Sequence, residues 1–316
     1  MSGPLERVVK EELGLSVLKG TGVSGGGCIN QGTAYDTDKY GRVFIKVNSK
    51  SGARTMFEGE FASLEALAAP GIVRVPKPIK VIDQPSGGAA LVMEYVEMGG
   101  GLHKYAAQLG EQLARLHLHN GSLESAARMA ESNVHKLEGG PHYVGKFGFH
   151  VNTCCGYLEI DNTWRDNWQE FYANMIENHV KMVEKNASDR QARELWNKVL
   201  PKLPRFFDGV DIKPAIVHGD LWGGNASENN EGPLIFDPAS LYGHSEYDLG
   251  ISYLFGGFSG KFYEAYHKVI PKAPGFQMRK ELYKLFHYLN HWNHFGGGYR
   301  GSSISTLQAC VNSVYP

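Results

Sequence analysis

Three polar side chains in the C-terminal half of the chain have a spacing that few folds accommodate. Asp220 follows the apolar run at 214–217, Asn225 comes five residues later, and Asp237 ends the apolar run at 234–236. A loop that follows a buried strand is a usual place for catalytic groups. Carboxylate and amide oxygens are also ligands that Mg²⁺ accepts. The spacing therefore predicts two neighbouring strand ends that present a proton acceptor and two metal ligands.

Each of these residues alone also fits a plainer role. An aspartate such as Asp220 commonly caps a helix, Asn225 follows a Gly-Gly turn, and Asp237 fits the end of a strand. Together they match phosphoryl transfer from ATP, which needs a proton acceptor and ligands that hold Mg²⁺ on the phosphates. Protein kinases carry these groups in the motifs H-R-D-x-x-x-x-N and D-F-G. Here the Asp-to-Asn spacing is the same, but Gly219 replaces the arginine, so control through activation-loop phosphorylation is not expected.

The overall composition sets the class of protein. The chain has 316 residues, of which 42% are hydrophobic and 21% charged, as in a soluble globular protein large enough for two lobes. Its net charge of −1 argues against nucleic acid or an anionic membrane as a partner, and no apolar run reaches the ~18 residues of a membrane span. Residues 1–15 lack a signal-peptide core and the cysteines lack metal-type spacing. We therefore expect a cytoplasmic protein with reduced thiols.

The order of hydrophobic patterns divides the chain near Gly99-Gly100-Gly101. Residues 16–98 have the pattern of short strands, glycine-rich turns and one helix at about 53–69, which predicts a small, mostly antiparallel sheet. After the glycine run the pattern predicts helices at 102–119, 168–185, 189–203, 246–255 and 278–292. The polar segment at 121–140 is predicted to be a mobile connection with a helical turn. The prediction is an α+β protein with an N-terminal lobe at 1–98 and a mainly helical C-terminal lobe at 99–316.

Lys46 is placed to complete a nucleotide site. In the strand around it, Val43 and Ile45 face one side of the sheet, so Lys46 faces the other. The following helix has an apolar stripe that consists of Phe57, Phe61, Leu64, Leu67 and Ala68. Glu60 falls within this stripe, and an unpaired buried carboxylate is very costly, so we predict a Lys46–Glu60 ion pair like the one that orients ATP phosphates in kinases. An ordinary surface salt bridge is the alternative.

Two other segments are predicted to contact the nucleotide. Gly25-Gly26-Gly27 lies between two strands, where backbone N–H groups can approach phosphates closely, although glycine-rich hairpins are common without this role. The strand at 89–96 would run into a kinase hinge. Met93 would then lie behind the nucleotide, with the Glu94 carbonyl and the Val96 backbone at the adenine edge. A plain buried strand is the alternative.

Segments along nearly the whole chain resemble the fructosamine-3-kinase and ketosamine-3-kinase family, within the wider aminoglycoside-phosphotransferase-like kinase fold. The similar segments are Gly26-Gly27-Cys28-Ile29, Tyr35-Asp36-Thr37-Asp38, Val43 to Asn48, Met56 to Glu60, Lys146 to Phe149, Thr153 to Gly156, His218 to Trp222, Asp237 to Ser240, Tyr242 to Glu246 and Asn290 to Gly296. Matches of this length are highly specific. The resemblance implies a bilobal protein-kinase-like fold and the cofactors ATP and Mg²⁺.

The resemblance also implies an activity and a role for each site residue. The activity is ATP-dependent phosphorylation of the 3-hydroxyl of ketosamines, free or on protein lysines, after which the unstable product sheds the sugar. The implied roles are the base for Asp220, metal ligands for Asn225 and Asp237, and phosphate orientation for Lys46. Trp222, His291 and Trp292 are candidates for the acceptor pocket, with a core aromatic and a buried structural histidine as alternatives. Asp248 is expected to brace the catalytic loop.

Two alternatives to this function are open. One is a different acceptor on the same fold, such as an aminoglycoside or choline. The other is a pseudokinase that acts as a nucleotide- or redox-gated binding protein, although Lys46, Asp220, Asn225 and Asp237 are all present. Within the resembling family, Gly223-Gly224 and residues 298–303 are more similar to the branch limited to ribulosamines, psicosamines and similar ketosamines than to the fructosamine branch.

Cys28 is a candidate for redox control. It follows the glycine-rich turn, where backbone N–H groups can lower the pKa of a thiol and favour its oxidation. A Cys28–Cys28 disulfide would link two chains, so we expect a monomer or a redox-linked homodimer. An inert small residue in a turn is the alternative. Non-reducing gels of oxidised wild type and Cys28→Ser distinguish the two.

Overall fold

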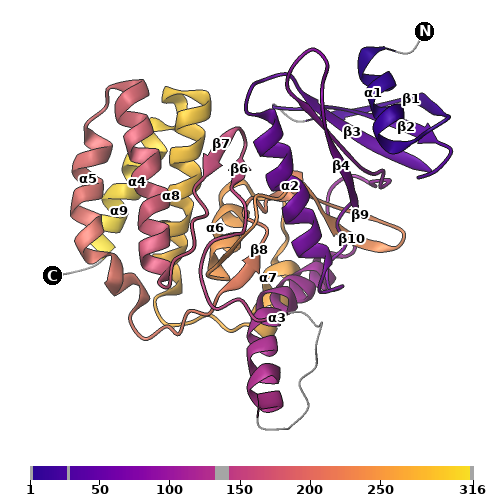
Figure 1. Ribbon diagram of the computed structural model, residues 1–316. Helices are drawn as coiled ribbons and strands as arrows, with labels where there is room; N and C mark the ends of the chain where they lie inside the picture. The colour runs from indigo at the N-terminus through magenta and orange to yellow at the C-terminus, as the bar shows by residue number, and fades with distance from the viewer. Residues whose placement is uncertain (1–2, 27–28, 132–141, 314–316) are drawn as a thin grey trace.

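The computed structural model describes residues 3–26, 29–131 and 142–313, and it has two lobes (Figure 1). The elements of the smaller lobe are α1 (Pro4–Leu13), β1 (Leu18–Gly26), β2 (Gln31–Thr37), β3 (Arg42–Asn48), α2 (Ala53–Ala68), β4 (Pro78–Asp83) and β5 (Ala89–Glu94). The strands form one antiparallel sheet in the order β1-β2-β3-β5-β4. Helix α1 covers one face of this sheet, and α2 lies between the other face and the larger lobe.

The alternation of side chains along β3 confirms the expected two-sided strand. Val43 and Ile45 pack under α1, together with Ala90 and Val92 of β5. Lys46 therefore lies on the opposite face, toward α2 and the larger lobe. The strand thus buries one apolar face against α1 and presents its other face to the space between the lobes.

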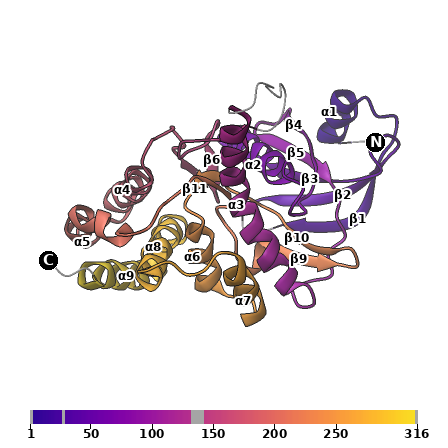
Figure 2. The same ribbon diagram turned by 90° about the horizontal axis from the view of Figure 1, so that it is seen from below.

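Helices dominate the larger lobe. Its elements are α3 (Ala106–Glu131), β6 (Thr153–Cys155), β7 (Leu158–Ile160), α4 (Trp168–Ala187), α5 (Gln191–Val199), η1 (Leu200–Phe207), β8 (Ala215–Val217), η2 (Gly223–Asn225), β9 (Ala226–Asn229), β10 (Gly232–Ile235), β11 (Leu241–Gly243), α6 (Glu246–Phe255), α7 (Gly260–Val269), α8 (Phe276–Phe295), η3 (Gly297–Tyr299) and α9 (Arg300–Ser313). Helices α4, α5, α8 and α9 form a bundle at the end farthest from the sheet, and α3 packs on α7 (Figure 2).

Three short antiparallel pairs, β6–β7, β8–β11 and β9–β10, lie beside the space between the lobes. The loop after β8 and the loop after β10 are those that carry Asp220 and Asp237. The glycine run at 99–101 connects β5 to α3, and the Gly99 N–H donates to the Glu228 carbonyl of β9. A division into 1–98 and 99–316 remains our proposal for the two lobes.

Helix α3 is longer than the sequence pattern predicted. We expected a helix that ended at His119, yet α3 runs without a break through Gly121 to Glu131. This last part contains good helix formers, and Glu124 forms ion pairs with Arg128 one turn later and with Lys213. One glycine costs only about 1 kcal/mol in such a helix, so the pattern misplaced its end. Residues 132–140 of the expected connection lie outside the described part of the chain.

Three helices, α1, α7 and α9, were not predicted at all. Helix α9 shows why, because its buried residues are Ser303, Thr306, Leu307 and Cys310. Small and polar residues of this kind give no hydrophobic stripe, even where tertiary packing against α5 and α8 buries them. Within the described ranges, no helix is both long enough and apolar enough to cross a membrane.

A buried ion pair joins α6 to α8. Arg279 is fully buried, and its Nε and Nη2 donate to the two carboxylate oxygens of Glu246 at 2.8 Å each. Its Nη1 donates to the carbonyls of Phe206 (3.1 Å) and Pro274 (2.6 Å). Every charged atom of this pair thus has a partner, as burial requires.

Loss of this pair has a defined cost. We expect Arg279→Met to lower the free energy of unfolding by about 3–5 kcal/mol, because it leaves the Glu246 carboxylate buried without a cation. Urea unfolding measures the change. The matched control is Arg42→Met, which breaks the exposed Arg42–Asp36 pair and is expected to cost about 0–1 kcal/mol. Equal losses in the two variants would contradict this account.

Candidate active site

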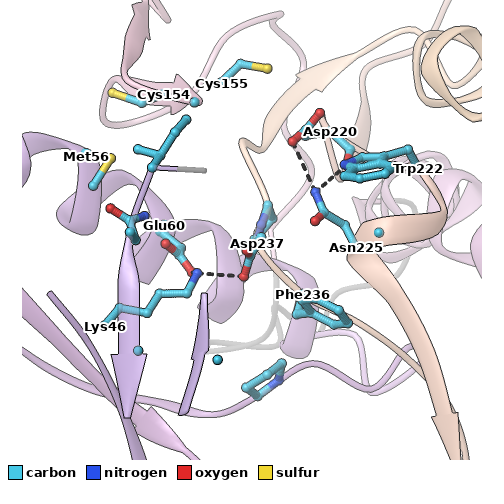
Figure 3. A pocket seen from close by; sticks show the side chains of 18 of the residues that line it. Lys46, Met56, Glu60, Cys154, Cys155, Asp220, Trp222, Asn225, Phe236 and Asp237 are labelled. Atoms are coloured by element: carbon cyan, nitrogen blue, oxygen red, sulfur yellow. Dashed lines mark hydrogen bonds and ion pairs between the residues drawn. The ribbon is translucent and has the colours of Figure 1, made fainter. Parts of the chain in front are cut away.

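A cavity of about 990 Å³ lies between the lobes and contains nearly all the candidate residues. The small lobe contributes the turn end of β1, the inner face of β3 and the segment after β5. The large lobe contributes the loops after β8 and β10, the pair β6–β7 and the C-terminal part of α8. Figure 3 shows the centre of this cavity, with Lys46 and Glu60 facing Asp237 from the small lobe. A cavity of this size suits a nucleotide together with a small acceptor.

Lys46 joins the two lobes through two carboxylates. Its Nζ lies 2.5 Å from Glu60 Oε1 and 2.6 Å from Asp237 Oδ1. Lys46 and Glu60 are only 7% and 8% exposed, so the pair is the buried one expected from the helix stripe. Burial alone would lower the pKa of Lys46, but the charges of Asp237 and Glu60 outweigh it and raise the pKa above its usual value. Lys46 is therefore a permanent cation in the cavity.

Helix α2 can hold Glu60 there because it packs closely on the large lobe. A Cβ on Gly59 would lie 2.7 Å from the Asn152 carbonyl oxygen, so only glycine permits this approach. One turn later, Ser63 Oγ accepts a hydrogen bond from the Ser240 N–H, next to the Asp237 loop. The helix is thus fixed against the same segment that carries Asp237.

The Asp237 backbone has an uncommon conformation. Its φ of 58° lies in the left-handed region, which non-glycine residues rarely adopt and which costs about 1–3 kcal/mol. Three hydrogen bonds hold the neighbouring backbone, namely Phe236 N–H to Asn225 O (3.0 Å), His218 Nε2 to Phe236 O (2.9 Å) and Ala239 N–H to His218 O (2.9 Å). Because surrounding structure maintains the strain, we attribute it to the position that the Asp237 carboxylate must take.

His218 connects the loop that carries Asp220 to the loop that carries Asp237 through both of its ring nitrogens. The Asp220 N–H donates to His218 Nδ1 at 3.2 Å, so Nδ1 is an acceptor and Nε2 carries the proton that is donated to Phe236. Burial lowers the pKa of His218, which keeps the ring neutral as this pattern requires. His218 is therefore a connector between the loops and carries no charge.

Asp248 braces the catalytic loop, as the sequence predicted. Its two carboxylate oxygens accept the backbone N–H groups of His218 and Gly219, each at 2.8 Å. Gly219 has a φ of 85°, and a Cβ there would lie 2.0 Å from the Ala239 carbonyl oxygen. The arginine of the protein-kinase motif has no room at this position, which explains the glycine.

Asp220 is held by neutral donors from its own loop and from β6. Asn225 Nδ2 donates to the Asp220 carboxylate at 3.1 Å and to its backbone carbonyl at 2.9 Å, and the Cys155 thiol donates to the same carboxylate. Burial raises the pKa of Asp220 to about 7, and the nearby charge of Asp237 acts in the same direction. A carboxylate with this pKa is suited to accept a proton near neutral pH.

This pKa predicts the pH dependence of the reaction. As the proposed base, Asp220 would accept a proton only in its deprotonated form, so kcat/KM is expected to rise with pH and to level off near the pKa of about 7. A divalent cation beside Asp237 offsets the charge that raises this pKa, so saturating Mg²⁺ should move the break to lower pH. Initial rates across a pH series at low and high Mg²⁺ measure the break. If the pH of the break is the same at low and high Mg²⁺, the result would contradict the proposed electrostatic interaction between Asp220 and Asp237.

The donor set at the centre of the cavity fits Mg²⁺. The Asn225 amide donates from its nitrogen to Asp220, which turns its Oδ1 away from that residue. The Asp237 carboxylate is 43% exposed to the cavity despite its bond to Lys46. A hard cation that takes oxygen ligands and retains several waters is compatible with these two groups. Asn225 and Asp237 would hold such an ion, as the motif spacing predicted.

The other residues predicted to contact the nucleotide lie at the end of the cavity that the small lobe forms. Gly25 lines the cavity and Gly26 ends β1. Met93 and Glu94 line the cavity from the end of β5, and Val96 lines it from the segment that follows. A Cβ at Gly32, the partner of Gly25 across the hairpin, would overlap the Phe44 ring, so the Phe44 side chain of β3 lies directly against this hairpin. Gly27 and Cys28 lie outside the described residues, and the phosphate and redox roles expected for them stay predictions.

Aromatic side chains from the large lobe form the opposite end of the cavity. Trp222 is 38% exposed, so it is not a core residue, and its ring lies over Gly224, which has no Cβ to interfere. The ring centroid of Phe255 lies 6.1 Å from that of Trp222 and 4.7 Å from that of His291. Tyr299 follows, 5.0 Å from His291. We refer to Trp222, Phe255, His291, Phe295 and Tyr299 as the aromatic wall.

Trp292 does not belong to this wall. It is 4% exposed, is absent from the residues that line the main cavity, and contacts a separate small hollow beside Arg300. Successive residues of a helix point about 100° apart, and in α8 His291 is turned toward the cavity while Trp292 is turned away from it. Our expectation that both line the acceptor pocket was therefore wrong for Trp292.

Several cavity residues had not been singled out from the sequence. Phe255 ends α6, and the glycines after it pack against Gly223, whose N–H donates to the Gly256 carbonyl at 3.1 Å. A helix that ends in Phe-Gly-Gly was the available signal for such a contact. Cys155 lies in the segment Thr153 to Gly156 that resembles the family, but nothing local marked its approach to Asp220.

Comparison of the sequence with known proteins points to one family. The family model for fructosamine kinase matches residues 5–313. Ketosamine-3-kinase of Mus musculus is 57% identical over 309 residues, which cover 96% of this chain and 99% of the mouse protein. The chloroplastic protein-ribulosamine 3-kinase of Oryza sativa subsp. indica is 38% identical and covers 91% of this chain and 78% of its own.

Solved structures agree on the fold. A protein of Haemophilus somnus classed as a fructosamine-3-kinase superposes with a TM-score of 0.75 at 21% identity, over 97% of this chain and 96% of its own. An aminoglycoside phosphotransferase shares the fold at a TM-score of 0.56 and 13% identity. The predicted bilobal kinase-like α+β fold is thereby confirmed. By its sequence over almost its entire length, this chain belongs to the fructosamine kinase family.

Proposed function

We propose that this protein is an ATP-dependent kinase that phosphorylates the 3-hydroxyl of ketosamines, free or attached to protein lysines. One observation carries the proposal, namely that Asp220 lies in one cavity with the Lys46–Asp237 pair and the aromatic wall. The mouse relative, 57% identical, is named a ketosamine-3-kinase, and the rice relative a protein-ribulosamine 3-kinase. The phosphorylated product is unstable and loses the sugar, so the activity serves deglycation.

The small-lobe side of the cavity supports ATP as the phosphoryl donor. Lys46 would contact phosphate oxygens while Glu60 keeps its charge in place. The adenine would lie against Met93, with its edge at the Glu94 carbonyl and the Val96 backbone. Mg²⁺, held by Asn225 and Asp237, would neutralise the charge that develops on the phosphates when bound.

The large-lobe side supports an acceptor that combines a sugar and an amine. The flat ring of Trp222 beside Asp220 suits the C–H face of a sugar. A ketosamine nitrogen is a secondary amine that carries a positive charge when protonated, and aromatic faces attract such cations. The aromatic wall thus offers one surface for both parts of the molecule, with His291 at its centre.

Asp220 would act on the acceptor hydroxyl. Its carboxylate takes the proton as the hydroxyl oxygen forms a bond to the γ-phosphorus, and the bond from that phosphorus to the β-phosphate oxygen breaks. The products are the 3-phosphate, ADP and a protonated Asp220, which returns its proton to water. Cys155 and Asn225 donate hydrogen bonds that hold the carboxylate in position in the cavity.

An acceptor panel tests the proposal. Purified protein with labelled ATP and Mg²⁺ is given ribuloselysine, psicoselysine, fructoselysine, an aminoglycoside and choline. We expect phosphate on the ketosamines, with ribuloselysine and psicoselysine preferred to fructoselysine. Transfer to the aminoglycoside or choline alone would refute the activity. Equal turnover of fructoselysine would refute only the sugar preference.

We further propose a reducing compartment, such as the cytoplasm, for this enzyme. Cys154, Cys155 and Cys310 are free thiols, and two of them are buried. An oligomeric state of monomer, or of a homodimer linked through Cys28, remains a proposal that the non-reducing gels described above address.

A further inference from the structure

Side chains from β6 and α8 form a second group around Asp220. Cys155 at the end of β6 and His287 on α8 each place a possible ligand atom near the Asp220 carboxylate, and all three atoms lie within 4.8 Å of one another. Cys155 is 3% exposed and His287 is fully buried. The Asn290 side chain donates to the Cys155 carbonyl at 3.2 Å, which fixes β6 against α8 at this point.

The imidazole of His287 makes no hydrogen bond within the described part of the chain, although the backbone carbonyl of His287 accepts from His291 Nδ1. Neither Nδ1 nor Nε2 has a partner within the described part of the chain, although both atoms are buried. The hydroxyl of Tyr247, whose ring lies 5.6 Å from that of His287, is buried without a partner as well. Buried polar atoms nearly always have a partner, and each exception calls for an explanation such as a bound ion. An unpartnered imidazole within reach of a thiol and a carboxylate is such a case.

We propose that Cys155, Asp220 and His287 form a binding site for a Zn²⁺ ion, and that occupation of this site inhibits phosphoryl transfer. Sulfur, nitrogen and oxygen ligands together favour a borderline-soft divalent ion, whereas Mg²⁺ takes oxygen ligands. Three protein ligands leave one tetrahedral position for water, which the cavity supplies because Cys155 and Asp220 both line it.

The charges of such a site balance. Zn²⁺ would displace the proton of the Cys155 thiol, so the ion, one thiolate, one carboxylate and a neutral imidazole sum to zero. A neutral cluster avoids the cost of a buried net charge. Burial and the charge of Asp220 raise the pKa of Cys155, so without metal the thiol keeps its proton and donates it to Asp220.

Inhibition follows from the double use of Asp220 and rests on its proposed role as the base. A carboxylate that ligates Zn²⁺ shares one lone pair with the ion, and the positive charge of the ion opposes the uptake of a proton, so it is a much weaker base. Metal binding itself does not depend on that role, so its measurement is independent of ketosamine turnover.

Cobalt titration tests the site, because a Co²⁺–thiolate bond gives a charge-transfer band in the near ultraviolet. We expect one Co²⁺ per chain with this band, displaced by Zn²⁺, in protein free of nucleotide and Mg²⁺. Cys155→Ser should abolish the band, and His287→Gln should weaken Co²⁺ binding by more than about 100-fold, since even partners of the ligands contribute about 10–100-fold. Cys154→Ser is the matched control and should keep the band, because its sulfur lies on the other side of β6 from that of Cys155 (Figure 3).

The outcomes separate clearly. No band in the wild type, or a band that survives in Cys155→Ser, would place any bound metal elsewhere and overturn the proposal. If either variant fails to fold, anomalous scattering at the zinc edge from soaked wild-type crystals decides, with a peak required between the three side chains. Zn²⁺ should also inhibit turnover at saturating Mg²⁺, with full recovery on chelation. Zinc binding without inhibition would overturn the regulatory half alone, and absence of ketosamine turnover would count against the proposed function only.

Discussion

Asp220→Asn is expected to lower kcat by about 10²–10⁴-fold, the contribution that a positioned acid or base typically makes. The amide has nearly the same shape as the carboxylate but cannot accept the hydroxyl proton. Asn225 can still donate to the new side-chain oxygen, so the loop should keep its conformation. Because Asp220 makes no ion pair with Lys46 within the described structure, ATP affinity should change little. Turnover with labelled ATP and nucleotide binding by calorimetry measure the two effects.

The control for this variant is Asp166→Asn. Asp166 has an 85% exposed side chain, pairs with Lys146 at the surface and lies outside the residues that line the cavity, so the same chemical change there should leave kcat unaffected. The residual activity of Asp220→Asn should also lose the pH break expected near 7. Wild-type turnover in Asp220→Asn would show that another group accepts the proton.

Lys46→Met is expected to lower both activity and stability. Loss of a preorganised cation that faces the phosphates should reduce kcat by about 10²–10³-fold, by analogy with the removal of one oxyanion donor. At neutral pH the free energy of unfolding should fall by up to about 3–5 kcal/mol, because Glu60 is left buried without its partner. Steady-state kinetics and urea unfolding measure the two losses.

The stability loss should depend on pH in a definite direction. Burial raises the pKa of Glu60, and without Lys46 nothing opposes this shift. A carboxyl whose folded-state pKa is raised binds more protons in the folded state than in the unfolded state, so stability falls as pH rises through the folded-state pKa. Lys46→Met should therefore be closest to wild type in acid and weakest at neutral pH.

A second substitution separates the two effects of Lys46→Met. The double variant Lys46→Met/Glu60→Leu removes both charges, so most of the lost stability should return while activity stays low. Recovery of activity in the double variant would show that Lys46 serves only to neutralise Glu60. Unchanged stability of Lys46→Met at every pH would show that the buried pair does not form.

The sequence was sufficient where one element or one motif determines the position of a side chain. Strand alternation placed Lys46 on the inner face of β3, and the helical period placed Glu60 on the buried side of α2. Both periods are properties of a single element, so tertiary structure was not needed to find the pair. The bracing role of Asp248 was implied by the family resemblance, and its two contacts with backbone N–H groups agree with it.

Long-range packing determined the features that the sequence did not predict. Phe255 and Tyr299 meet at the aromatic wall only because α6 and η3 both pack on α8. Cys155 and His287 are 132 positions apart and become neighbours through the contact of β6 with α8. No local pattern records which face of α8 is turned to the cavity, and the error at Trp292 has the same origin.

The hydrogen bonds around His218 have a consequence for inhibitors. Because Phe236 is tied to Asn225 and His218, and Ala239 to His218, the segment that carries Asp237 cannot turn outward without breaking all three links. In hydrogen exchange these amides should open together as one cooperative unit. Inhibitors that bind only when the Asp237 segment turns outward are therefore not expected to bind this enzyme. Selective inhibitors are better directed at the aromatic wall.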